Sequence, residues 1–352
     1  SITGGAGDDI ITGGDGNDTF NVDSGTDTVN DLGGSSGGEN DIVIISAGAT
    51  VNANNIVSFV ATSATQNNST DAGNAVLTAK SGAGRTISVA NATGSSKAFT
   101  LVGSDGNDSL TGGAGDDIIS VTSAGHANAD ILDGGAGTDT LVLSSGTHTL
   151  TSENKIVNIE NINLSTSGSG TNVDLTGQTE AFTITAGNFA NTIKSGGGAD
   201  TIVGGTNVDT ITGGAGDDII TGGAGNDIIT IDSGEDKVKD LGGASGSEQD
   251  VVVVNAGATL NAIDIIGFTA TNATKNDSTD ANNAKLTAKD GGTRTIDVSL
   301  ATGSSKAFKL IGGTGQDSLT GGAGADIITG GDAVDTIVGN AGADSITGGA
   351  GD

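Results

Sequence analysis

The stretch that decides the fold is residues 213–230, which read GGAGDDIIT followed by GGAGNDIIT. These are two consecutive copies of a nine-residue unit, G-G-x-G-x-D-x-U-x, in which U is a large aliphatic residue. Glycine at the first, second and fourth positions permits a tight turn with positive φ angles. The residues after the aspartate form a very short strand whose aliphatic side chain points inside. A short fixed period of this kind predicts a solenoid of stacked coils.

The nine-residue unit recurs in four runs, roughly 1–30, 103–142, 186–239 and 312–352. Two units, 22–30 and 231–239, lose the first two glycines, which predicts capping turns. The second run is broken after Ser120 by a stretch that is longer than one unit. We therefore expect the coils of the second run to be less regular than those of the third.

A longer repeat overlies the short one, because residues 1–119 match residues 210–328 at a constant offset without a gap. The segments between the runs show short β patterns bounded by Gly, Asn and Ser. The prediction is an all-β chain of parallel β-rolls alternating with small β-sandwich or otherwise β-rich modules, part of a longer tandem array. A short helical turn is expected over 52–60. The expected domains are a roll at 1–30, module A at 31–102, an irregular roll at 103–142, module B at 143–185, a roll at 186–239, module A′ (a repeat of module A) at 240–311 and a roll at 312–352.

The composition excludes several classes of protein. The 352 residues include 63 Gly, 43 Asp and Glu but 13 Lys and Arg, and no Cys, giving a net charge of −30. Nucleic acid is not an expected partner, because phosphate contacts need Lys and Arg. Without cysteine there is no disulfide framework and no sulfur-ligated metal. No apolar run is long enough to span a bilayer.

The negative charge sits mainly on aspartates beside glycines, where turns hold the carboxylates and a cation is needed to balance them. Hard oxygen ligands at a flexible turn suit Ca²⁺, which takes several oxygens. Zinc prefers His or Cys, which the chain has almost none of. The alternative is a solvated acidic surface without metal, but stacked carboxylates repel one another when no cation is bound. Calcium is therefore expected to be part of the fold.

These units resemble the RTX (repeats-in-toxin) calcium-binding family. The resemblance implies that two units make one coil of a parallel β-roll and that aspartates two units apart share calcium ions. The implied pairs are Asp9/Asp27, Asp200/Asp218, Asp209/Asp227, Asp218/Asp236, Asp317/Asp335 and Asp326/Asp344, with Asp108/Asp130 and Asp117/Asp139 in the broken run. The implied ligands of multiple Ca²⁺ ions are the carboxylates of Asp9, Asp18, Asp27, Asp108, Asp117, Asp139, Asp200, Asp209, Asp218, Asp227, Asp236, Asp317, Asp326, Asp335 and Asp344. Turn carbonyls are implied around Gly5, Gly7, Gly14, Gly16, Gly196, Gly198, Gly214, Gly216, Gly223, Gly225, Gly322 and Gly324.

Other polar residues carry weaker expectations. His126 and His148 are expected on the surface, as are Lys97 and Lys306. Acidic residues shared by both copies of the module are candidates for further calcium outside the rolls, namely Asp31/Asp240, Glu39/Glu248, Asp41/Asp250 and Asp71/Asp280. The chain has no zinc-protease motif, nucleophile elbow or nucleophilic cysteine, so we do not expect an enzyme.

Three function classes remain open. The first is a calcium-dependent structural protein of the bacterial cell surface, which assembles with copies of itself into an S-layer lattice or an extracellular filament. GGAGTDTLVL at 134–143 followed by IVNIENINLS at 156–165 is similar to the RTX-bearing S-layer proteins of the Caulobacter type. The alternatives are an RTX adhesin or biofilm matrix protein, and the calcium-binding tail of a larger type I-secreted enzyme or toxin. All three imply an extracellular location, and cell-surface polysaccharide is a candidate partner.

Overall fold

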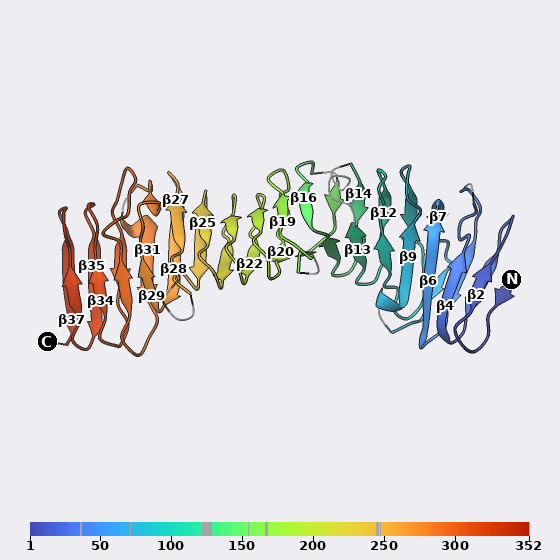
Figure 1. Cartoon of the computed structure of the whole chain (residues 1–352), viewed down its shortest axis with the longest axis horizontal. Coiled ribbons are helices and arrows are strands. Elements are labelled where there is room, and N and C mark those ends of the chain that lie inside the picture. Colours follow the sequence, from blue (N-terminus) through green and yellow to red (C-terminus); the bar gives the residue numbers. More distant parts are fainter. Residues whose placement is uncertain are drawn as a thin grey trace. The chain divides into compact units, whose positions relative to one another are not determined.

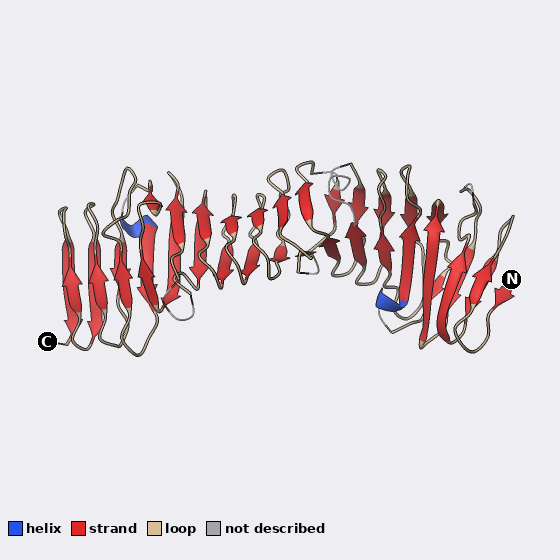
Figure 2. Ribbon diagram, viewed as in Figure 1, coloured by secondary structure: helices blue, strands red, loops and turns tan. Residues whose placement is uncertain are grey.

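Each short strand contributes one aliphatic side chain to a narrow core. In the nine-residue units this is the eighth residue: Ile202, Ile211 and Ile220, for example, are fully buried. Strand residues on either side of it point outward, which follows from the alternation of side chains along a strand. The computed structural model describes residues 1–352 except 36, 71, 122–128, 154, 166–167, 244–245, 247, 280 and 352. The described elements are almost all strands joined by loops and turns (Figure 2).

The chain divides into two compact units, Ser1–Ser167 and Gly168–Asp352. In the first unit one long parallel sheet has the order β2 (Ile10–Thr12), β4 (Gly25–Asn30), β6 (Ala49–Ile56), β9 (Ala75–Ala79), β11 (Thr100–Val102), β13 (Ile118–Val121), β15 (Thr140–Leu143) and β18 (Asn161–Asn163). A second sheet contains β1 (Ile2–Thr3), β3 (Thr19–Val22), β5 (Ile42–Ile45) and β8 (Gln66–Asn67). A third contains β7 (Ser58–Val60), β10 (Thr86–Ser88), β12 (Ser109–Thr111), β14 (Ile131–Asp133) and β17 (Ile156–Val157). The remaining elements are β16 (Gly146–Thr149) and a 3-10 helix, η1 (Ala72–Asn74).

The second unit repeats this plan (Figure 1). Its long sheet contains β20 (Thr183–Thr185), β22 (Thr201–Gly205), β24 (Ile219–Gly223), β26 (Glu235–Lys239), β28 (Thr259–Ile265), β31 (Ala284–Ala288), β33 (Lys309–Ile311), β35 (Ile327–Asp332) and β37 (Ser345–Ala350). The facing sheets are β19 (Thr171–Asp174), β21 (Thr192–Lys194), β23 (Thr210–Thr212), β25 (Ile228–Ile231), β27 (Val251–Val254) and β30 (Lys275–Asn276), then β29 (Gly267–Thr269), β32 (Thr295–Asp297), β34 (Ser318–Thr320) and β36 (Thr336–Val338). A second 3-10 helix is η2 (Ala281–Asn283). The prediction of an all-β fold built on parallel β-rolls is confirmed.

Coil length distinguishes the rolls from the modules. In the third run Thr201 pairs with Ile219, which holds the same position two units further along, so two nine-residue units make one coil. In module A′ Leu260 of β28 pairs with Ala284 of β31, which makes this coil longer than two units. The extra residues form a third side of the coil. Between β28 and β31 the chain contributes β29 to the sheet of β32 and β30 to the sheet of β27, so this coil has strands in three sheets. The strands of the module thus extend the parallel sheets of the roll.

This arrangement corrects two expectations. Module A is β-rich as predicted, but its described strands pair in parallel with one another and with those of the neighbouring runs and do not form a separate sandwich. The helical turn expected over 52–60 is wrong, because this segment lies in β6 and β7. Val51, Ala53 and Ile56 are buried, and a left-handed Asn55 with a register shift places Ile56 inside. This irregularity gives the strand a spacing of apolar residues that resembles a helix.

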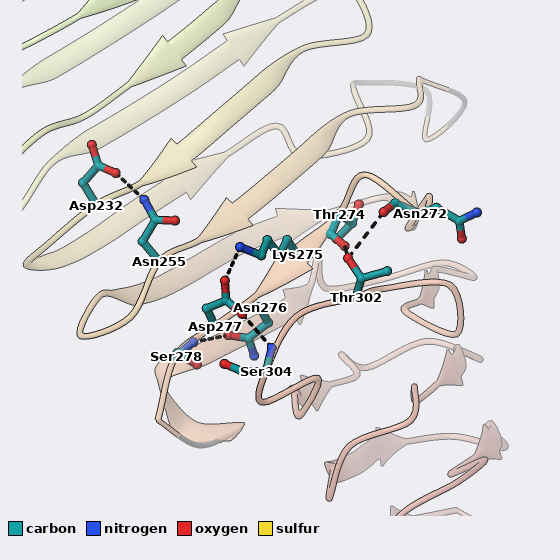
Figure 3. Close-up of polar contacts among 10 residues, drawn as sticks. All are labelled: Asp232, Asn255, Asn272, Thr274, Lys275, Asn276, Asp277, Ser278, Thr302 and Ser304. Carbon is teal, nitrogen blue, oxygen red and sulfur yellow. Dashed lines mark hydrogen bonds and ion pairs between the residues drawn. The ribbon is translucent and has the colours of Figure 1, made fainter.

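Side-chain amides hold the coils of the modules together. Asn276 is fully buried; its Nδ2 donates to the carbonyl of Ala307, and its Oδ1 accepts from the backbone N–H of Ser278 at 2.9 Å. Asn67 makes the equivalent bonds to Ala98 and Ser69 in module A. Figure 3 shows this cluster in module A′, with Asp277 bonded to Lys275 and to the N–H of Ser304. The polar atoms of these buried amides find partners within the protein.

Candidate metal centres

The sixth-position aspartates lie in rows along the rolls. In the third run the backbone N–H of Asp200 donates to Oδ1 of Asp218 at 2.8 Å, and that of Asp218 donates to Oδ1 of Asp236 at 3.0 Å. Asp209 and Asp227 make the same contact on the opposite side of the coil at 2.8 Å. The structure also brings together the pairs expected elsewhere, which are Asp9/Asp27, Asp108/Asp130, Asp117/Asp139, Asp317/Asp335 and Asp326/Asp344.

The second carboxylate oxygen has no donor in most of these aspartates. Asp218, Asp227 and Asp236 are at most 1% exposed, yet their Oδ2 atoms have no hydrogen-bond partner. The same holds for the buried Oδ2 atoms of Asp9, Asp27, Asp139, Asp200, Asp209 and Asp335. A buried charged oxygen without a partner is costly, so such groups are normally paired or coordinate a metal. These orphaned oxygens fit a bound cation.

The first glycine of each unit cradles this oxygen. A Cβ atom at Gly213 would lie 2.4 Å from Oδ2 of Asp218, and one at Gly222 would lie 2.5 Å from Oδ2 of Asp227. The first position therefore requires glycine for lack of space, and its φ is not positive as the sequence led us to expect. Positive φ does occur at the second and fourth positions, with values of 93° at Gly214 and 124° at Gly216.

Four of the candidate glycines depart from that pattern. Gly196, Gly198, Gly322 and Gly324 do not have positive φ. Close approach to the preceding coil explains three of them. A Cβ would lie 2.3 Å from the carbonyl oxygen of Gln178 at Gly196 and 2.0 Å from that of Glu180 at Gly198, and at Gly324 it would meet the Lys306–Ala307 backbone at 2.4 Å. The other predicted glycines, Gly5, Gly7, Gly14, Gly16, Gly223 and Gly225, have positive φ.

Burial makes these carboxylates reluctant to ionise in the metal-free protein. It raises the pKa of Asp218 to about 7, with a further contribution from the charge of Asp236, and it raises the pKa of Asp236 to about 7. Burial also raises the pKa of Asp209 and Asp227 to about 6. A nearby cation would favour the ionised form. The rows are therefore electrostatically incomplete without one.

Side chains alone do not complete a metal site. Among the described residues there is no group of three or more His, Cys, Asp or Glu side chains placed to hold a metal ion. A hard cation with many oxygen ligands would therefore need backbone carbonyls beside each carboxylate. This is the ligand set expected from the glycine-rich turns, and its assignment to particular carbonyls stays a prediction.

The family described as RTX calcium-binding nonapeptide repeat (4 copies) matches residues 1–29, 100–121, 122–147, 183–211, 203–238, 309–337 and 329–352. The matched segments cover half of the chain. The chain belongs to the RTX calcium-binding repeat family. It therefore carries calcium-binding repeats, in a family whose members are typically secreted. No curated protein matches the chain.

The RTX rows continue into residues that the nonapeptide pattern does not contain. The N–H of Asp227 donates to Oδ1 of Asp250 at 2.8 Å, and that of Asp18 donates to Oδ1 of Asp41 at 2.8 Å. In the second run the N–H of Asp139 donates to Oε2 of Glu160 at 2.7 Å. Asp41 and Asp250 could be recognised as candidates in the sequence because they occupy equivalent positions in the two copies of the module. Glu160 had no such signal, because the coil that carries it lacks the glycines of the unit.

The remaining candidates divide between surface and interior. Lys97 and Lys306 are exposed, as expected. His148 is fully buried and its Nε2 lies 2.9 Å from the carbonyl oxygen of Ser144, so the expectation of a surface histidine is wrong there. It sits among the inward-facing residues of β16, where alternation carries it inside. His126, Asp71 and Asp280 lie outside the described residues.

The shared acidic residues around Asp240 lie close to one another. The carboxylates of Glu248 and Asp240 interact, and burial followed by this repulsion raises the pKa of Asp240. Oε2 of Glu248 is buried without a partner, as is Oε2 of Glu39 in the other copy. Additional calcium at these residues stays a prediction. Among the described residues no helix has the length and apolarity to cross a membrane.

Proposed function

We propose that this chain is a calcium-dependent structural protein of the bacterial cell surface, which assembles with copies of itself into an S-layer or an extracellular fibril. The observation that carries the proposal is the row of buried carboxylates whose second oxygens have no donor in the protein. A solenoid in which each short strand contributes one aliphatic side chain to the core has little hydrophobic burial to offset this cost. Calcium binding then becomes part of the folding free energy.

Multiple calcium ions follow from the repetition of the site. Carboxylates with orphaned oxygens recur at Asp27, Asp139 and Asp335 as well as in the long third run. Each would hold an ion together with carbonyls of the glycine-rich turns. The bound ions would neutralise the carboxylates and tie neighbouring turns together. Each roll would become rigid once the ions are bound, as repeat proteins that contact only their neighbours do when every interface is formed.

Assembly with other copies is favoured by the same ions. The net charge of −30 makes copies of the metal-free chain repel one another. Each Ca²⁺ that enters adds two positive charges and lowers this repulsion. Calcium outside the cell would therefore promote folding and association together. Cell-surface polysaccharide is the anchoring partner that an extracellular structural protein of this kind would need.

Electron microscopy and sedimentation velocity on the full chain test the proposal in Ca²⁺, in Mg²⁺ and in chelator. We expect ordered lattices or filaments in Ca²⁺ and unassembled chains in the other two conditions. A chain that binds calcium but stays monomeric at high protein concentration would overturn the proposal of a self-assembling structural protein. Binding of such monomers to isolated cell-surface polysaccharide would instead support the adhesin alternative.

A further inference from the structure

Most of the described nine-residue turns fall into two classes according to the partner of the aspartate Oδ2. In the open turns described above, this oxygen is buried without a donor. In four other turns it accepts a hydrogen bond from the backbone N–H of the second residue of its own turn. The donor and acceptor residues are Ser104 and Asp108 (2.7 Å), Gly113 and Asp117 (2.6 Å), Gly313 and Asp317 (2.7 Å), and Gly322 and Asp326 (2.7 Å). We call these four the self-closed turns.

The backbone of the second residue differs between the two classes. In stacked open turns that keep glycine at this position it is left-handed, with φ of 93° at Gly214, 99° at Gly223 and 118° at Gly331. The open turns of Asp27 and Asp236 are exceptions, because their second residues, Asp23 and Asp232, are not left-handed. In the self-closed turns it is not left-handed at Gly113, Gly313 or Gly322. The third residue of a stacked open turn donates to the second-position carbonyl of the coil before it, as Ala215 does to Gly196 at 2.9 Å. Such a turn is thus shaped by an equivalent turn beneath it.

The turn of Asp200 lies between the two classes. It is the first regular turn after module B, and its second residue, Gly196, is not left-handed. Its Oδ2 makes no hydrogen bond of normal geometry, although Ser195 and the N–H of Gly196 interact with the carboxylate and oppose the increase in its pKa that burial causes. The N–H of Phe182 donates to Oδ1 of Asp200 at 2.7 Å, as that of Phe308 does to Asp326, so the start of the roll after module B resembles the self-closed turns in this contact.

The self-closed turns have no equivalent turn beneath them, because they are the first two turns after each copy of the module. Oδ1 of Asp317 accepts from the N–H of Arg294 at 2.9 Å, and Oδ1 of Asp326 accepts from that of Phe308 at 2.7 Å. Arg85 and Phe99 are the donors to Asp108 and Asp117 in the first copy, at 2.7 and 2.6 Å. The two copies, one in each unit, therefore show the same arrangement.

The turn beneath Asp117 and Asp326 is a modified nine-residue unit. GSSKAF at 94–99 and 303–308 places Phe99 and Phe308 where the rolls have aspartate. Both phenylalanines are fully buried, and Lys97 and Lys306 take the fourth, glycine position with left-handed φ of 59° and 55°. This turn offers no carboxylate to a shared ion. It supplies the N–H that the aspartate above it accepts.

We propose that the self-closed turns are calcium-free caps that start a roll, and that calcium is bound from the next coil onward. Both oxygens of Asp108, Asp117, Asp317 and Asp326 are already occupied by backbone N–H groups. Their carboxylates close the turn in place of an ion. The module and the two turns above it form a scaffold on which the calcium-dependent coils stack. This inference deepens the proposed function and rests on its premise that open turns bind calcium.

A matched pair of variants in the fourth run tests the proposal. Asp317 and Asp335 occupy the same row, and the N–H of Asp317 donates to Asp335, but Asp317 is self-closed whereas Asp335 is open. Native mass spectrometry of the full chain at saturating Ca²⁺ counts the bound ions. We expect Asp335→Asn to lose at least one ion and Asp317→Asn to keep the wild-type number. Loss of the same number of ions from both variants would overturn the proposal.

A second pair keeps the test decisive if Asp317→Asn does not fold. Asp117 is self-closed and Asp139 is open in the second run, and they are joined in the same way. Asp117→Asn is expected to keep its ions and Asp139→Asn to lose one. A wild-type chain that binds no calcium would refute the proposed function itself. A wild-type chain that binds calcium, with equal losses in both classes of variant, would refute only the calcium-free caps.

Discussion

The roll at 186–239 and module A′ at 240–311 use the same parallel sheets but stabilise their turns in different ways. The roll closes each coil in two nine-residue units and buries carboxylates whose second oxygen lacks a donor, as at Asp227. The module joins β28 to β31 by a longer coil and buries Asn276, a neutral amide bonded within the protein. The short coil at Asp227 therefore depends on an external cation, whereas the longer coil satisfies the buried amide of Asn276 with its own hydrogen bonds. The difference predicts that the two regions respond differently to calcium.

The largest expected effect is that of calcium removal. A chelator should abolish amide protection throughout 186–239 while 240–311 keeps a measurable part of its protection. An ion at ten times its dissociation constant stabilises the fold by about 1.4 kcal/mol, and several ions would exceed the stability of a narrow roll. Hydrogen exchange with mass spectrometry, resolved by segment, measures this. Equal loss of amide protection in both regions would contradict the proposed difference in calcium dependence between the roll and the module.

A change in the roll alone should reduce calcium affinity. Gly222→Ala places a Cβ atom 2.5 Å from Oδ2 of Asp227, so the carboxylate or the turn must move. We expect the free energy of unfolding of the calcium-loaded protein to fall by about 1–3 kcal/mol, as for other overpacked sites. Thermal unfolding at saturating calcium and a calcium titration measure the two effects.

Gly197→Ala is the control for that variant, because its nearest neighbour is at 3.5 Å and its φ is not positive. This glycine occupies the third position of a unit in the same roll. It should unfold within a few degrees of the wild type. Similar losses in both variants would mean that the first-position glycine has no special relation to the carboxylate.

A substitution in the module alone should lower stability by an amount that does not depend on the calcium concentration. Asn276→Ala leaves the carbonyl of Ala307 and the N–H of Ser278 without their partner, at a cost of about 1–3 kcal/mol. The cost should be the same at low and high calcium for as long as the module is folded. Asn272→Ala is the matched control, since only its backbone carbonyl is used, by Thr302. Urea unfolding at two calcium concentrations measures the difference.

The smallest expected effect is a response to pH in the metal-free protein. Folding raises the pKa of Asp218 and Asp236 from an ordinary value near 4 to about 7. Their protonated form therefore favours the folded state fully below about pH 4, and this advantage is lost as the pH rises through 7. Chelated protein should regain β structure when acidified from pH 7.5 to 5, as circular dichroism can show. Calcium-loaded protein should show no such gain, and a further loss in the chelated sample would contradict the raised pKa values.

The sequence predicted the roll well because one unit contains the whole local mechanism. The fixed spacing of Asp200, Asp218 and Asp236 was sufficient to place them in one row. It could not show that Asp117 and Asp326 accept a second N–H from their own turns, since their units read like the others. That difference depends on the coil beneath, which is set by long-range stacking. The sequence also did not predict the third side of the module. A strand as short as β30 shows no periodicity that could reveal it.

The two-unit coil has a consequence for how such a chain can change in length. Insertion or deletion of two units adds or removes one complete coil and leaves every remaining strand in its own sheet. A change of a single unit would exchange the two faces for the rest of the roll, so that every later strand would stack on the wrong partner. Recombination between such repeats is therefore tolerated in even numbers of units. Designed variants of this roll can be lengthened in the same steps, with a predictable gain in height and in ion number.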